Sequence, residues 1–111
     1  MRVLDEPIQK IELKKADFVF PDNFVKGVVD IKKGLLAIDA ELHADLEQML
    51  LDNGSDQYDL WGINLYFDDG EDLVEFDSMI NIRPAQGNHS RNVEDEKTQN
   101  KILDVVNKWV R

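Results

Sequence analysis

Acidic and imidazole side chains alternate along one short segment of the chain. Asp39, Glu41 and His43 occupy every second position, and alternate side chains of an extended chain point to the same side. Carboxylate oxygens are ligands for Mg²⁺, Mn²⁺ or Ca²⁺, and an added imidazole nitrogen admits Zn²⁺ or Fe²⁺. The segment therefore suggests a divalent-metal site. With Arg83 holding an anionic substrate, it would suit a small metal-dependent hydrolase.

The same segment also fits a structural role. Its spacing matches neither the zinc-binding His-Glu-x-x-His motif nor an EF-hand loop, and the chain holds two histidines and no cysteine. Asp45 or a neighbour would cap the following helix, and His43 would be a surface residue where strand meets helix. We therefore predict no cofactor and keep the divalent metal as the alternative.

A polar loop before the last predicted helix is the second candidate site. A helix N-terminus and two guanidinium groups there could hold a phosphate or a carboxylate. In the structural alternative, the amide and hydroxyl side chains bond their own backbone, and the arginines pair with nearby acids. The ligand-binding candidates in this loop are Arg83, Gln86, Asn88, His89, Ser90 and Arg91.

Alternation along the predicted strands gathers further polar side chains on one face of a sheet. Antiparallel sheets commonly expose one face to water, so a solvated surface is one interpretation. A ligand site, or a surface covered by a partner protein, is the other. The predicted face carries Asp39, Glu41, Asn64, Tyr66, Glu75, Asp77, Asn81 and Arg83, of which Asn64, Glu75, Asp77 and Asn81 join the ligand-binding candidates.

The elements that position these residues follow from hydrophobic periodicity and turn signals. A hairpin is predicted around Gly34, and a second one around the acidic turn 68–72. Their order, α-ββ-α-ββ-α, predicts a single α+β domain over residues 1–111, with an antiparallel sheet of about four strands, two hairpins and about three helices on one face. The expected helices are 8–17, 42–53 and a last one capped by Asn92, and the expected strands are 24–31, 35–40, 60–67 and 73–83.

Composition limits the classes of function. The 111 residues include 23 acidic and 13 basic side chains, which give a formal charge of −10. That charge repels a phosphate backbone, so we predict no nucleic-acid partner. No run of about eighteen apolar residues and no signal-peptide pattern is present, so we predict no membrane partner and a cytoplasmic location. The absence of cysteine excludes a disulfide scaffold and a thiol nucleophile.

Several segments spread over residues 25–110 resemble a family of short, uncharacterised bacterial and archaeal proteins, defined by a domain of unknown function. The resemblance implies no activity, cofactor or catalytic residue. The segments that carry it are 28–30, 36–38, 41–45, 60–66, 75–84, 86–91 and 93–95.

Together these features favour a small acidic binding or interaction protein without catalysis of its own. In this interpretation the polar sheet face and the 83–92 loop bind a polar or anionic small ligand or a protein partner. The metal-dependent hydrolase is the alternative. A third possibility is that the aromatic segment 18–24 forms an apolar patch for self-association or for docking on a larger protein. The oligomeric state is left open.

Overall fold

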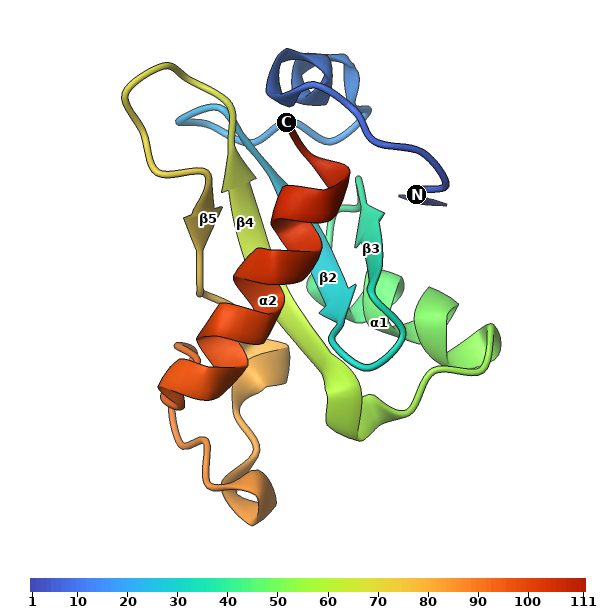
Figure 1. Cartoon of the computed structure of the whole chain (residues 1–111), viewed down its shortest axis with the longest axis vertical. Helices are drawn as coiled ribbons and strands as arrows, with labels where there is room; N and C mark the ends of the chain where they lie inside the picture. The colour runs from blue at the N-terminus through green and yellow to red at the C-terminus, as the bar shows by residue number, and fades with distance from the viewer.

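A five-stranded antiparallel sheet forms the centre of this α+β protein, and the computed structural model describes residues 1–111 (Figure 1). The strand order is β1-β3-β2-β4-β5, so the longest strands, β2 and β4, lie side by side in the middle. The strands are β1 (Arg2–Val3), β2 (Phe24–Asp30), β3 (Leu35–Ile38), β4 (Leu60–Tyr66) and β5 (Val74–Glu75).

The β2–β3 hairpin forms where the sequence predicts it. Gly34 adopts a φ of 70° at the end of the loop, a conformation that favours glycine. The Asp30 carboxylate accepts the backbone N–H groups of Lys32 and Lys33 at 2.9 and 2.8 Å, which satisfies the donors of the turn. The hairpin pairs β2 with β3, and β2 pairs with β4 along its other edge.

Helices cover both faces of the sheet, whereas the sequence predicted helices on one face. Because alternate residues of a strand face opposite sides, the neighbours Val28 and Val29 belong to two separate cores. The helix α1 (His43–Asp52) packs Leu46 and Leu50 on the Val28 side, and α2 (Glu96–Trp109) packs Ile102 on the Val29 side (Figure 1). Neither α-helix is long and apolar enough to cross a bilayer.

The second predicted hairpin is much shorter than expected. The strand predicted over 73–83 pairs with β4 only at Val74 and Glu75. Beyond that point the Asn81 carboxamide takes the place of a strand: its Oδ1 accepts the Gly62 N–H at 2.8 Å, and its Nδ2 donates to the Gly62 carbonyl at 2.9 Å. The segment then forms two short 3₁₀ helices, η3 (Met79–Asn81) and η4 (Pro84–Gln86).

Other elements also differ from the prediction. The helix expected over 8–17 is a 3₁₀ helix, η1 (Lys10–Lys15), in which Leu13 is the buried residue. The last helix is capped by Asp95, whose carboxylate accepts the Thr98 N–H, rather than by Asn92. The N-terminal residues add β1 as a fifth strand, and a 3₁₀ turn, η2 (Gln57–Asp59), leads into β4.

Burial beneath α1 can be tested by comparing two leucines. Leu46 is fully buried against the sheet, while Leu42, just before the helix, is 54% exposed. We predict that Leu46→Ala lowers the free energy of unfolding by about 2–5 kcal/mol, because it leaves a cavity. Leu42→Ala should change it by about 0.5 kcal/mol or less. Urea denaturation measures both, and equal losses would contradict a covered sheet face.

The close approach at Gly62 gives a second prediction. A Cβ atom at this position would lie 2.5 Å from the Cβ and Oγ atoms of Ser78. Gly62→Ala should therefore lower the free energy of unfolding by about 1–3 kcal/mol through overpacking. The double variant Gly62→Ala with Ser78→Gly removes the clash and should recover part of that loss in a urea denaturation curve. A Gly62→Ala variant as stable as the wild type would show that the segment does not press on β4.

Candidate functional site

A pocket opens on the α1 side of the sheet, at the N-terminal end of α1. Its volume is about 330 Å³. We call it the histidine pocket. It is lined by Phe20, Phe24, Lys26, Leu42, His43, Ala44, Asn64, Asp77, Ser78, Met79, Ile80 and Arg91. Four of the residues predicted from the sequence, namely His43, Asn64, Asp77 and Arg91, meet here.

His43 is the first residue of α1 and lies against β4. Its Nε2 lies 2.8 Å from the carbonyl oxygen of Ile63. Because a carbonyl only accepts, Nε2 carries the hydrogen, and Nδ1 is the unprotonated acceptor of the neutral ring. Burial lowers the pKa of His43, the Ile63 carbonyl opposes that shift, and the nearby Lys26 charge adds to it. His43 therefore contributes a neutral imidazole to the pocket.

Asn64 supplies a buried acceptor without a donor. Its side-chain nitrogen donates to Glu75 Oε1 at 2.9 Å, which fixes the orientation of the carboxamide, since a carboxylate only accepts. Asn64 is 5% exposed, and its Oδ1 is buried with no hydrogen-bond partner. A buried acceptor left unpaired costs about 1–3 kcal/mol. Asn64 is thus the polar group of the pocket that is least satisfied by the protein itself.

Two cations stand at the rim of the pocket. Lys26 lies opposite Asn64 in the sheet register, donates to the Glu41 carbonyl at 3.0 Å and sits 4.7 Å above the Phe20 ring. Arg91 forms an ion pair with Asp77 at 2.7 Å, and both side chains are substantially exposed. The pocket therefore combines acceptors on the sheet with positive charge at its edge.

Most polar groups of the predicted 83–92 loop are engaged within the protein. Arg83 donates to the carbonyls of Ile80, Gln57 and Leu60 and lies 4.8 Å from the Trp61 ring. Gln86 donates to the Tyr58 carbonyl at 3.2 Å. These bonds tie the loop to the start of β4.

Buried asparagine side chains form hydrogen bonds with the backbone of the same loop. Asn88 is buried and donates to the carbonyls of Asn81, Ser90 and Asn92, while its Oδ1 accepts the Glu94 N–H. Asn81, another predicted ligand residue, is fully buried on Gly62. Their geometry matches the structural alternative.

The carboxylate of Glu94 accepts hydrogen bonds from the predicted loop. It accepts the backbone N–H groups of His89 and Ser90 and the Ser90 hydroxyl. These bonds, the His89 N–H foremost, hold the pKa of Glu94 below its usual value. An acid of the chain itself thus accepts these loop N–H groups, and the expected anion site at the helix N-terminus and the two arginines stays a prediction.

The three predicted metal ligands are not brought together. The Asp39 carboxylate accepts the N–H groups of Asp17 and Phe18 at 3.0 and 2.9 Å, Glu41 is exposed, and His43 bonds β4. No three histidine, cysteine or acidic side chains lie in an arrangement that could hold a metal ion. The metal-dependent hydrolase stays a prediction without geometric support.

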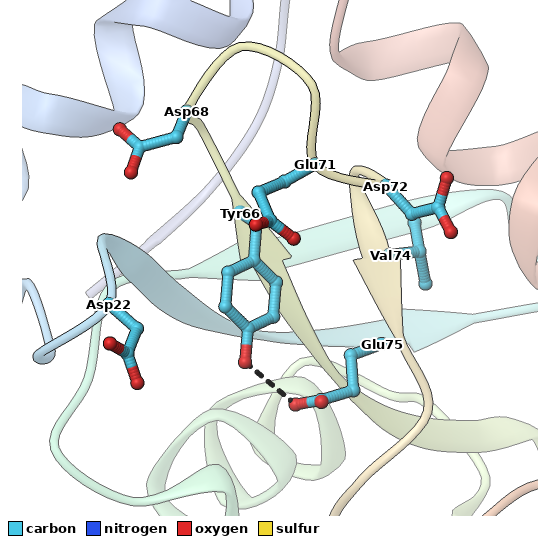
Figure 2. A pocket seen from close by; sticks show the side chains of 7 residues that line it. All are labelled: Asp22, Tyr66, Asp68, Glu71, Asp72, Val74 and Glu75. Carbon is cyan, nitrogen blue, oxygen red and sulfur yellow. Dashed lines mark hydrogen bonds between the residues drawn. The ribbon is translucent and has the colours of Figure 1, made fainter.

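An acidic hollow adjoins the histidine pocket, where β4 meets the 68–72 turn. Figure 2 shows carboxylates arranged around the Tyr66 ring. The Tyr66 hydroxyl donates to Glu75 Oε1 at 3.0 Å. Burial raises the pKa of Tyr66 to about 12, and the bond and charge of Glu75 add to the effect. The hollow has a volume of about 530 Å³ and is lined by Asp22, Tyr66, Asp68, Glu71, Asp72, Val74 and Glu75.

The sequence prediction missed the contributions of β2 and of the preceding aromatic segment. Phe24 and Lys26 alternate on the same strand face as Asn64 and Tyr66, and Phe20 stacks on Phe24 with ring centroids 5.2 Å apart. The alternation of Phe24 and Lys26 was visible in the sequence. Its meaning depended on the pairing of β2 with β4.

The neutral state of His43 has a measurable consequence. Below its unfolded-state pKa of 6.5, the unfolded chain binds a proton that the folded chain excludes, so the free energy of unfolding should fall as the pH falls from about 6.5 towards 5. His43→Gln keeps an N–H donor for the Ile63 carbonyl and should remove this part of the pH dependence. His89→Gln is the matched control and should keep it. Urea denaturation at several pH values measures the effect, and an unchanged slope in His43→Gln would contradict it.

A family model covers nearly the whole chain. The family described as Protein of unknown function (DUF5674) matches residues 2–109. No curated protein and no solved structure matches the chain. The match confirms the resemblance to a domain of unknown function and brings no activity with it. The chain belongs to the DUF5674 family.

Proposed function

We propose that this protein is a binding protein that takes a small polar group into the histidine pocket. The observation that carries the proposal is Asn64, a lining residue of that pocket whose buried Oδ1 has no hydrogen-bond partner. Proteins pair the large majority of their buried polar atoms. Because Asn64 also lines the pocket, its unpaired acceptor favours a ligand that brings an N–H or O–H donor.

The rest of the lining defines what such a ligand carries. The neutral imidazole of His43 also lines the pocket, and the cations Lys26 and Arg91 favour a negative or acceptor group at the rim. Half of the lining residues are apolar, and Phe24 and Ile80 among them fit a carbon skeleton. A volume of about 330 Å³ lies at the small end of the range for ligand pockets, about 300–1,000 Å³. The ligand is therefore small, with a donor at one end and an anionic or polar group at the other.

Binding is favoured over catalysis by the state of Ser78, the lining residue that carries a hydroxyl group. Ser78 lines the pocket, but it is almost fully buried, and its Oγ accepts the Ile80 N–H at 3.3 Å. The groups that face the pocket are acceptors and cations suited to recognition.

The proposal is tested by titrating ¹⁵N-labelled protein with N-acetylglycine, which carries an amide N–H and a carboxylate, and with its uncharged amide. We expect saturable shifts of the backbone amides around His43, Asn64 and Ile80, with weaker binding of the uncharged compound. Asn64→Leu removes the open acceptor and should weaken binding about tenfold, the equivalent of about 1.4 kcal/mol. Asn107→Leu, at an exposed position of α2, should bind like the wild type.

Two results would overturn the proposal. One is that neither compound produces saturable shifts in the pocket. The other is that Asn64→Leu binds both compounds as the wild type does.

A further inference from the structure

We infer that the histidine pocket and the acidic hollow form one groove, and that this groove receives an extended basic segment of a partner protein. The inference rests on the proposed function, because it names the molecule whose polar group enters the histidine pocket. The segment would place a backbone amide, with the apolar side chain of the same residue, in the histidine pocket and a lysine or arginine in the acidic hollow.

The two depressions are joined by residues of β4 and β5. Asn64 lines one and Tyr66 lines the other. They are two positions apart on the same face of β4, which corresponds to about 7 Å along the strand. Glu75 accepts hydrogen bonds from both of them, at 2.9 and 3.0 Å. The Phe24 ring, 5.0 Å from the Tyr66 ring, continues the same surface.

Charge selects the partner at the acidic end. Five of the seven residues that line the hollow are acidic, and none is basic. The structure contains two ion pairs, Arg83–Glu47 and Arg91–Asp77, and neither includes an acid of the hollow. In Figure 2, Asp22, Glu71 and Glu75 approach Tyr66 from different sides. Such a cluster attracts and orients a positively charged side chain.

Apolar side chains mark the other end of the groove. Met79 is 66% exposed and Leu42 is 54% exposed at the edge of the histidine pocket. Phe24 and Ile80 line the same pocket. Large apolar side chains that gather at a pocket indicate a surface for a partner, whereas isolated ones carry no such meaning. An apolar side chain of the partner would cover these residues.

The spacing of the two ends fits an extended chain. Residues i and i+2 of an extended segment point to the same side, about 7 Å apart. An apolar residue followed two positions later by a lysine or arginine would therefore reach both ends. A second copy of this chain is a poorer occupant, because each copy carries a net charge of −10 and like charges oppose association.

The test compares two capped peptides, acetyl-Leu-Gly-Lys-Gly-amide and acetyl-Leu-Gly-Glu-Gly-amide, by NMR titration of the labelled full chain. The lysine peptide should shift amides around both Asn64 and Glu71, and its affinity should fall with salt. The glutamate peptide should bind at least about tenfold more weakly. Equal affinities for the two peptides would overturn the inference.

Charge reversal separates this inference from the proposed function. Glu71→Lys with Asp72→Lys should weaken the lysine peptide about tenfold and leave N-acetylglycine binding unchanged. Glu6→Lys with Asp104→Lys makes the same change in net charge at exposed positions elsewhere and should have a much smaller effect. Equal losses in the two double variants would overturn the inference.

Other results assign the groove differently. If N-acetylglycine binds and the lysine peptide does not, the inference fails and the proposed function stands. If neither binds, both fail. If light scattering shows twice the mass of 12.8 kDa and the groove amides broaden with protein concentration, the occupant is a second copy, and the inference is overturned.

Discussion

The hydrogen bonds between the Asn81 carboxamide and the backbone of Gly62 are the constraint on which the site depends. They satisfy the N–H and the carbonyl that β4 would otherwise offer to a neighbouring strand. They also end the β4–β5 pairing after Glu75. Because Gly62 has no side chain, Ser78 and Ile80 can lie directly on the strand. The chain from Asp77 onward is thereby directed over the α1 face, where it closes one side of the histidine pocket.

In the loop that follows, an asparagine side chain again pairs backbone groups that no strand or helix pairs. Asn88 holds the carbonyls of Asn81, Ser90 and Asn92, so the loop has an internal frame without regular structure. Arg83 anchors the outside of the loop on carbonyls near the start of β4. Buried amides that are fully paired stabilise one conformation, because each would be costly if unpaired. Asn64 differs from these residues because its buried Oδ1 has no hydrogen-bond partner.

Local sequence patterns predicted the elements whose partners lie nearby. The hairpin around Gly34 and the helix beginning at His43 follow from turn residues and from leucines at helical spacing. The prediction of a strand over 73–83 was wrong because the alternating apolar residues were assumed to face one core. In the structure Phe76 packs on the α2 side and Ile80 on the α1 side. The partner of Asn81 lies nineteen positions away, and no local pattern reveals it.

The candidate site shows the same limit. Asn64, Asp77 and Arg91 were recognised as polar candidates, but their association with Lys26 depends on the β2–β4 register. β3 and α1 lie between these two strands in the sequence, so their register cannot be derived from either strand alone. The covering of the second sheet face by α1 was also missed, because an amphipathic helix does not specify on which face it packs.

The sheet has edges that are too short to template another strand. β1 and β5, its two outer strands, are two residues long each, and Asn81 caps the backbone of β4 just beyond β5. Long unpaired edges promote pairing between molecules and ordered aggregation. In this protein the central strands, which are the most apolar, are enclosed on both sides by their own chain. The architecture thus leaves the histidine pocket on a face of the sheet and offers other chains no long backbone edge to extend.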